Sequence, residues 1–359
     1  MHIFTIFTTI LFLPTFFCNS LCLSMNKKIN YELTPIKQFN NLYLKIKNFN
    51  NQNKEQYNLD QNNKIIKNEK FNSFLKLIRY KNIFPAIYLF LTGTWIVNPK
   101  FIEFIKTIKS PPIIYSLIST LLILSSNMVI NDLFDLKIDR INHSDRPLVS
   151  GEIKIKEAIL LAAGLILSTE LINIFLLPQK LQNPIHLSVL FTFIYTPILK
   201  KILFIKNISC ALMVAYTVFF GGFVAYNGSG NNKLNFLYQI ITFVFFGSLY
   251  NEILLDIRDY EGDKKNNIST IATVFGNKKA LNFSKNILLV NIYGNLLYLI
   301  NLNQIYYSIL FILLCIPIIA DFYLIKPDNI TKNNIITASY TSSTQLIFIL
   351  ILFCFLSFR

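Results

Sequence analysis

Two clusters of aspartates hold the residues of this 359-residue chain that are best placed to do chemistry. Each has the pattern D-x-x-D-x-x-x-D and follows an apolar run of about membrane length. The first cluster consists of Asp132, Asp135 and Asp139, and the second of Asp256, Asp259 and Asp263. On a helix, residues spaced i, i+3 and i+7 share one face. Ionised groups beside hydrocarbon are costly and usually functional, so this repeated pattern is the feature to explain.

Three carboxylates within two helical turns repel one another, and a divalent cation removes that cost. Mg²⁺ suits such hard oxygen ligands, and proteins usually hold it with one or two carboxylates together with substrate phosphates. Basic residues near the clusters are suited to phosphate; they are Arg79, Arg146, Lys200 and Lys201. A single acidic motif is often only a solvated loop or an interfacial ion-pair cluster. Two copies favour a cradle for a Mg²⁺-bound diphosphate.

The composition indicates an all-α, polytopic membrane protein. The chain is 53% hydrophobic, with a mean hydropathy of +0.46, which is too apolar for an ordinary soluble domain. Its formal net charge of +15 lies in the N-terminal segment and the loops, where membrane topology and anionic lipid explain it better than nucleic acid does. The five cysteines and three histidines show no metal-ligand spacing.

Apolar runs predict nine transmembrane helices. The expected ranges are 83–98, 111–131, 157–177, 184–200, 207–227, 235–256, 280–301, 304–325 and 335–357. With this count, most loop Lys and Arg residues fall on one side, which the positive-inside rule assigns to the cytosol, matrix or stroma. Both acidic motifs fall on that side. Gly221-Gly222 predicts close helix packing or close approach of substrate.

The N-terminal residues predict targeting segments rather than part of the helical domain, which we expect at 75–359. Residues 1–23 form a signal-like hydrophobic leader, for which an extra membrane anchor is the alternative. Residues 24–74 are rich in Asn and Lys and predict a disordered, basic segment of the kind found in transit peptides. Together they favour a plastid membrane, with the mitochondrial inner membrane or an endomembrane as alternatives.

The motifs resemble those of the UbiA-type intramembrane prenyltransferases. Asn131-Asp132-x-x-Asp135-x-x-x-Asp139, followed by Arg146-Pro147, is similar to the first signature of that family. The segment 256–264, with Ile268-Ser-Thr270 and Phe275-Gly276 after it, is similar to the second. Tyr195-x-Pro197-x-x-Lys200 resembles the end of the fourth family helix. Arg79-x-x-Asn82 resembles the pattern before the first, with Tyr80 in place of the usual proline.

This resemblance implies nine helices around a lipid-accessible chamber and Mg²⁺-dependent transfer of a polyprenyl group from its diphosphate to a lipophilic acceptor. The metal ligands that it implies are Asp132, Asp135, Asp139, Asp256, Asp259 and Asp263. The implied diphosphate-binding residues are Asn131, Arg79, Asn82, Arg146 and Lys201. The implied catalytic residues are Asp132, Asp135, Asp259, Asp263, Lys200 and Tyr195. By its sequence position alone, Tyr195 also suits a membrane-interface aromatic.

The acceptor stays open among three branches of the family. The second motif resembles those of homogentisate prenyltransferases, chlorophyll synthases and archaeal-type geranylgeranylglyceryl phosphate geranylgeranyltransferases. A plastid address favours the first two, whereas the intact Asn131-Asp132 pair resembles the last two. The expected prenyl group is geranylgeranyl or phytyl. A membrane transporter or channel with an acidic cation site is the alternative class, and it predicts carboxylates near the middle of the bilayer.

Overall fold

The computed structural model describes residues 69–226, 228, 231–325 and 330–358. One compact unit spans Phe74–Arg359. In the described part of this unit the regular secondary structure is helical throughout, as the composition predicts. The predicted leader (1–23) and nearly all of the predicted disordered segment (24–74) lie outside the described residues.

Nine long helices occupy the nine predicted ranges within the part of the chain that the structure describes. They are α4 (Ile83–Val97), α6 (Pro111–Phe134), α9 (Ile155–Leu176), α10 (Gln179–Tyr195), α11 (Ile205–Ala225), α12 (Asn231–Arg258), α15 (Asn277–Asn301), α16 (Ile305–Leu324) and α17 (Lys332–Leu356). Five of them, α6, α9, α11, α12 and α17, contain segments long and apolar enough to cross a membrane. The chain is an integral membrane protein.

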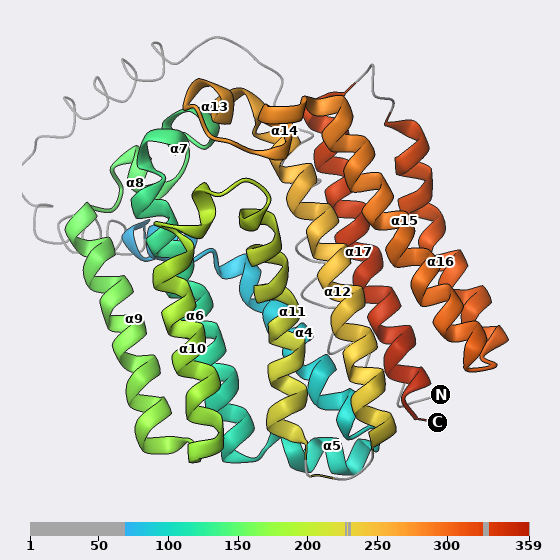
Figure 1. Ribbon diagram of the computed structural model, residues 1–359. Coiled ribbons are helices and arrows are strands. Elements are labelled where there is room, and N and C mark those ends of the chain that lie inside the picture. The colour runs from blue at the N-terminus through green and yellow to red at the C-terminus, as the bar shows by residue number, and fades with distance from the viewer. Residues whose placement is uncertain (1–68, 227, 229–230, 326–329, 359) are drawn as a thin grey trace, which may run out of the picture. The chain divides into compact units, whose positions relative to one another are not determined.

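Shorter helices connect the long ones at both ends of the unit. The connectors α7 (Leu136–Asn142), α8 (Pro147–Ser150), α13 (Tyr260–Lys265) and α14 (Ile271–Phe275) gather at one end, and α5 (Phe101–Ile108) lies at the other (Figure 1). Two 3-10 turns, η1 (Tyr80–Asn82) and η2 (Leu199–Lys201), precede α4 and α11. The end with α7 and α13 carries both acidic motifs.

Helix α10 differs from its predicted range of 184–200. It begins five residues earlier, at Gln179, and contains Pro184 in its interior. It ends at Tyr195, and the chain continues through a turn to η2. Pro197 has no N–H to continue the helical hydrogen-bond ladder, which explains the early end. Lys200 therefore lies on a 3-10 turn instead of the last turn of a membrane helix.

Large apolar side chains remain exposed on the outer helices. Leu160 and Phe175 on α9 are 72% and 74% exposed, and Leu324 on α16 is 74% exposed. Exposed apolar patches of this extent mark a membrane-facing or partner-facing surface. Because the unit has five helices long and apolar enough to cross a membrane, we infer that these exposed side chains face lipid tails.

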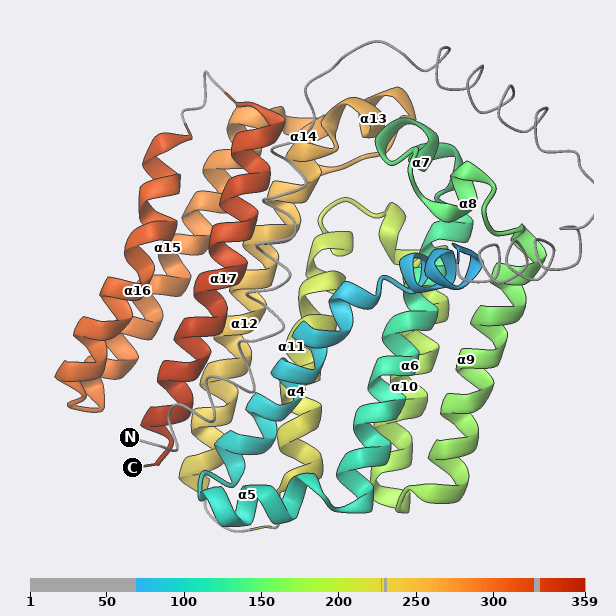
Figure 2. The same cartoon turned by 180° about the vertical axis from the view of Figure 1, so that it is seen from behind.

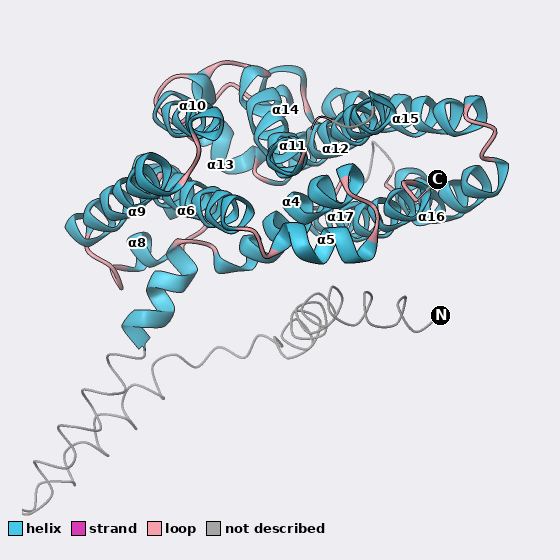
Figure 3. Ribbon diagram, turned by 90° about the horizontal axis from the view of Figure 1, so that it is seen from below, coloured by secondary structure: helices cyan, strands magenta, loops and turns pink. Residues whose placement is uncertain are grey.

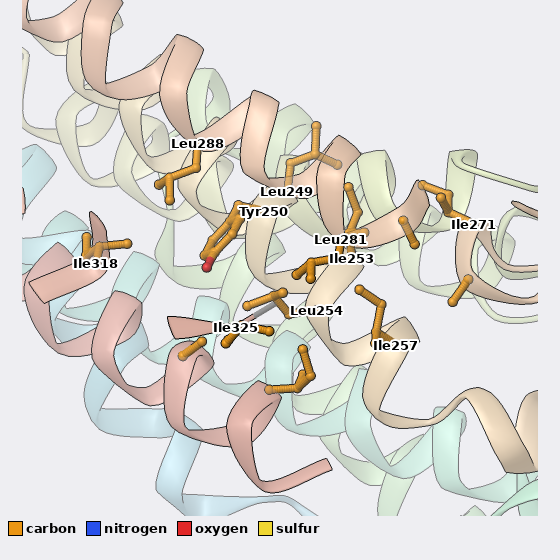
Figure 4. Packing of buried hydrophobic residues seen from close by; sticks show 14 of the residues in the cluster. Leu249, Tyr250, Ile253, Leu254, Ile257, Ile271, Leu281, Leu288, Ile318 and Ile325 are labelled. Carbon is orange, nitrogen blue, oxygen red and sulfur yellow. The ribbon is translucent and has the colours of Figure 1, made fainter. Parts of the chain in front are cut away.

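Three clusters of buried apolar side chains hold the helices together. One, around Leu249, Ile253 and Leu281, joins α12 to α15, α16 and α17 (Figure 4). A second joins α4 and α6 to α10 and α11 through Phe90, Leu181 and Phe220, among others. The third packs α6 against α8 and α9. Figure 3 shows α6, α9 and α10 on one side, α12, α15, α16 and α17 on the other, and α4 and α11 between them.

Helices α4 and α11 cross at glycines. A Cβ added at Gly221 would meet backbone atoms of Phe90, and one added at Gly93 would meet the backbone carbonyl of Val218. The Thr94 hydroxyl oxygen lies 3.1 Å from the Gly221 carbonyl oxygen, within hydrogen-bond reach. The close packing predicted from Gly221-Gly222 is confirmed.

Each acidic motif spans a break between two helices. Helix α6 ends at Phe134, and Asp135, with φ −89° and ψ 3°, separates it from α7. Helix α12 ends at Arg258, and Asp259, with φ −94° and ψ 8°, separates it from α13. The aspartates of each motif therefore lie on two helices that meet at the middle aspartate, and not on one uninterrupted helix. The middle aspartate of each motif occupies the sparsely allowed bridge region, which is common at active sites.

The segments that follow the two breaks are also alike. After α7 the chain forms the short helix α8, which ends at Gly151 with φ 80°. After α13 it forms the short helix α14, which ends at Gly276 with φ 85°. A long helix, α9 or α15, follows in each case. The same succession of elements thus carries both motifs.

Candidate active site

The first motif is built around a buried carboxylate with two arginine partners. Asp132, in the last turn of α6, is 2% exposed. It accepts hydrogen bonds from Arg79 Nη2 at 2.7 Å and from Arg146 Nη1 at 3.1 Å. Arg146 also donates to Asp139 in α7, so one guanidinium bridges two buried acids. Arg79 adopts the left-handed conformation, with φ 51°, which is uncommon for a residue other than glycine.

The turn after α10 supplies the other partners of the first motif. Lys200 on η2 forms an ion pair with Asp135. The Thr196 hydroxyl donates a 2.5 Å hydrogen bond to the side-chain oxygen of buried Asn131. Lys201 and Asn82 are exposed, and the structure does not bring their side chains to the acids. Seven of the predicted residues therefore meet at the first motif, namely Arg79, Asn131, Asp132, Asp135, Asp139, Arg146 and Lys200. Thr196, which the sequence did not single out, joins them.

The second motif has different partners. Asp256, in the last turn of α12, is 1% exposed and accepts from Lys206 Nζ at 2.6 Å and Asn207 Nδ2 at 2.8 Å. Both partners begin α11. Asp259 accepts two hydrogen bonds from Arg258, at 2.8 Å and 2.6 Å, and lies 3.9 Å from His143 Nε2.

Asp263, on α13, is the buried acid of this motif with a raised pKa. It is 5% exposed. Burial and the neighbouring Asp256 and Asp259 raise its pKa to about 6, although Lys206 and Lys200 act in the opposite direction. By contrast, hydrogen bonds from Arg258 and His143 outweigh burial and hold the pKa of Asp259 well below its usual range. Because Lys200 belongs to the first motif's surroundings, its effect on Asp263 links the two clusters.

The two motifs meet where α7 contacts α13. A Cβ added at Gly262 in α13 would meet the end of the Asn142 side chain in α7, so the two helices pack closely at this contact. His143, directly after Asn142, lies beside Asp259. This contact brings α7 of the first motif beside α13 of the second, whereas the expectation that the two sets of carboxylates face each other stays a prediction. Both motifs begin in the last turn of a long helix and continue into α7 or α13, which Figure 2 shows at one end of the long helices.

Every motif aspartate for which an ion pair is described has an Arg or Lys side chain of this protein as its partner. Among the described residues, no three Asp, Glu, His or Cys side chains gather closely enough to form a metal site by themselves. The donor set still fits Mg²⁺, because this ion commonly takes only one or two carboxylates and completes its shell with water and phosphate. Lys and Arg are equally suited to the phosphate oxygens.

Tyr195 lies apart from these ion pairs. It is 3% exposed, and its hydroxyl lies 2.8 Å from the Cys210 sulfur on α11. Cys210 in turn hydrogen-bonds with Glu252, one helical turn before Asp256. Tyr195 is therefore an inward-facing side chain and not an exposed interface aromatic. Glu252 was missed by the sequence reading, which counted only the repeated aspartates.

The raised pKa of Asp263 gives a testable pH dependence of stability. Its carboxyl holds its proton to a higher pH in the folded than in the unfolded protein. Folding is therefore progressively disfavoured as the pH rises from about 4 to about 6, by roughly 1–3 kcal/mol in total. Asp263→Asn should thus melt at a higher temperature than wild type above pH 6 and at the same temperature below pH 4, in metal-free detergent solution. Asp145→Asn, which changes an exposed carboxylate, is the control; equal curves for Asp263→Asn and wild type would contradict the assignment.

Comparison with known proteins supports one family. Residues 86–357 match the model of the UbiA prenyltransferase family. The chain is 33% identical over 253 residues to the digeranylgeranylglyceryl phosphate synthase of Saccharolobus solfataricus, covering 68% of this chain and 83% of that protein. It is 30% identical over 292 residues to the enzyme of the same name from Sulfolobus acidocaldarius, covering 77% of this chain and 97% of the relative.

Solved structures agree with this result. A structure of digeranylgeranylglyceryl phosphate synthase superposes with a TM-score of 0.59 at 25% identity, covering 80% of this chain and 98% of the other. A UbiA homologue of Archaeoglobus fulgidus, bound to GPP and Mg²⁺, shares the fold with a TM-score of 0.54 at 17% identity, covering 78% of this chain and 99% of the other. The family match spans both acidic motifs and all nine long helices from Ala86 onward, so this chain is an enzyme of the UbiA prenyltransferase family.

Proposed function

We propose that this enzyme transfers a geranylgeranyl group from its diphosphate to a hydroxyl of a prenylated glyceryl phosphate. The observation that carries the reaction type is the pair of acid clusters, each with its own cations, whose helices α7 and α13 are in contact. The choice of acceptor rests on the relatives, which are named digeranylgeranylglyceryl phosphate synthases. Among the three branches left open by the sequence, this one also agrees with the intact Asn131-Asp132 pair.

The cations and the carboxylates would change partners when substrate binds. Lys200, Arg79 and Arg146 now neutralise Asp135, Asp132 and Asp139. With a diphosphate present, their N–H groups would donate to its oxygens and release the carboxylates. Mg²⁺, held by aspartates of both motifs, would supply neutralisation of the leaving diphosphate. Asn82 and Lys201 would join the diphosphate contacts only by moving from their exposed positions.

The chemical step breaks the bond between the allylic carbon and the diphosphate oxygen. Positive charge develops on that carbon while negative charge grows on the leaving group, which the preorganised cations stabilise. The acceptor oxygen would form the new ether bond, and its proton would pass to the leaving diphosphate. Tyr195, buried beside Cys210, would help line a dry chamber in which the allylic cation escapes water. The nine long helices would be nine membrane spans around this chamber, in a catalytic domain that begins near residue 75.

Plastid targeting stays a prediction from the N-terminal residues. The relatives are archaeal proteins and give it no support. The transporter alternative is not favoured, because the acids lie at helix ends and the family is enzymatic.

The proposed reaction can be tested directly with purified, full-length protein in liposomes. Labelled geranylgeranyl diphosphate should give a labelled ether product with geranylgeranylglyceryl phosphate when Mg²⁺ is added, and none with EDTA. Homogentisate and a chlorophyll precursor serve as competing acceptors in the same assay. Prenylation of either of these, and not of the glyceryl phosphate, would assign the enzyme to another branch. Cation flux without any product would favour the transporter.

A further inference from the structure

A polar pocket lies at the same end of the unit as the acid clusters. Its volume is about 400 Å³, within the range of small-molecule sites. Helices α7, α12, α13, α15 and α17 contribute to its lining. None of the six motif aspartates is part of that lining. The pocket is therefore separate from the cradle proposed for the diphosphate.

The lining combines positive charge with apolar surface. Its cations are Arg258, Lys265 and Lys332, whereas Glu261 is its one acid. Asn142, Asn277 and Thr331 add polar groups, and the buried Asn277 side-chain oxygen has no hydrogen-bond partner among the residues that the structure describes. Ile257 and Ile335, both almost fully buried, belong to its apolar wall. An anionic group attached to a hydrocarbon chain matches this lining.

The pocket adjoins the second acidic motif. Arg258 lines the pocket and also binds both carboxylate oxygens of Asp259 through Nε and Nη2. An arginine has five N–H donors, so its guanidinium can serve a ligand in the pocket while it holds Asp259. On the α7 side, Asn142 lines the pocket and the next residue, His143, lies 3.9 Å from Asp259. One layer of residues thus separates the pocket from Asp259.

We propose that this pocket binds the phosphate monoester of the acceptor lipid, with Lys265, Lys332 and Arg258 as its phosphate contacts. This inference rests on the proposed function, which requires an acceptor that carries a phosphate besides the diphosphate of the prenyl donor. The two anions would then lie on opposite sides of Arg258 and Asp259. That arrangement places the glyceryl hydroxyl, a few bonds from its phosphate, next to the second motif.

Two exposed lysines outside the acid clusters, Lys265 and Lys332, can be substituted to test the proposal. The double substitution Lys265→Gln and Lys332→Gln should raise the KM for geranylgeranylglyceryl phosphate about 10- to 100-fold, the effect expected for lost charged hydrogen bonds. The KM for geranylgeranyl diphosphate and the kcat should stay within about twofold of wild type. Lysine-to-arginine substitutions at both positions should restore the acceptor KM.

Lys264→Gln is the matched control, because Lys264 precedes Lys265 on α13, lies over the Tyr260 ring and is outside the pocket lining. It removes the same charge from the same helix and should leave both KM values unchanged. Equal acceptor KM values for wild type and the double variant would overturn the proposal. If Lys264→Gln raised the acceptor KM by a similar factor, the effect would come from general surface charge, and the proposal would also be overturned.

A binding measurement separates this inference from the proposed function. Lysophosphatidic acid, a single-chain glycerol phosphate, should bind the metal-free protein and should bind the double variant at least tenfold more weakly. Inorganic phosphate should compete weakly, and phosphatidylglycerol in the vesicles should not compete. Equal competition by phosphatidylglycerol would identify an ordinary anionic-lipid site and overturn the assignment. Binding that depends on the lysines in a protein without prenyl transfer to glyceryl phosphate would support the phosphate site while refuting the proposed reaction.

Discussion

Replacing Asp135 by asparagine is expected to lower the rate of prenyl transfer about 100-fold or more while leaving the protein folded. The amide keeps the shape of the side chain and can still accept a hydrogen bond from Lys200, its partner in the structure. It removes the negative charge that would help to hold Mg²⁺ against the diphosphate. Loss of one preorganised electrostatic contact in an active site commonly costs a factor of about 100 to 1,000. Single-turnover assays with labelled geranylgeranyl diphosphate would measure the change.

The matched control for this variant is Asp145→Asn. Asp145 is an exposed carboxylate between α7 and α8, close to the first motif in sequence. Its substitution should leave the rate unchanged. Asp259→Asn should behave like Asp135→Asn, because the proposal needs both clusters. Full activity in either motif variant, with an acceptor that wild type prenylates, would refute the assignment of these aspartates.

Substitution of Gly221 by alanine should destabilise the protein by about 3 kcal/mol, the upper range for overpacking a well-packed contact. The added methyl group would meet backbone atoms of Phe90 on α4, which cannot rotate away as a side chain can. Separation of α4 from α11 would also disturb the Thr94 contact with Gly221. Thermal unfolding in detergent, followed by the fluorescence of buried Trp95 on α4, would measure the loss.

Gly164→Ala and Gly294→Ala are the controls for this prediction. Both glycines lie inside long helices, α9 and α15, and an added Cβ would meet nothing within 4 Å. Alanine has the higher helix propensity by up to about 1 kcal/mol, so these variants should melt at or above the wild-type temperature. If the Gly221→Ala protein melted at the same temperature as these controls, α4 and α11 could separate at their crossing without loss of stability, which would contradict the prediction.

The sequence was informative where the signal is local. A run such as 111–130 is apolar for long enough to predict a membrane helix, and α6 confirms it. The pairing of Asp132 with Arg146 joins residues only 14 positions apart, and both belong to one recognisable motif. The number of long helices and the end that carries the acids could be predicted for the same reason.

Contacts between segments that are far apart in the sequence leave no comparable local pattern. Lys206 and Asn207 bind Asp256 from about 50 positions away, and no sequence motif connects these residues. The breaks at Asp135 and Asp259 were also missed, since a single residue in the bridge region leaves the spacing of the aspartates unchanged. Helix α5 was read as part of a loop because its eight residues are too few to span a membrane.

The matching helix breaks give the two acidic motifs a repeated backbone plan. Both Asp135 and Asp259 interrupt a long helix with nearly the same backbone angles, and each is followed by a short helix, a second short helix that ends at a glycine, and another long helix. The ion pairs do not follow this repeat, because Lys200 pairs with the middle aspartate of the first motif and Lys206 with the first aspartate of the second. The repeated backbone plan therefore carries two different sets of charged partners.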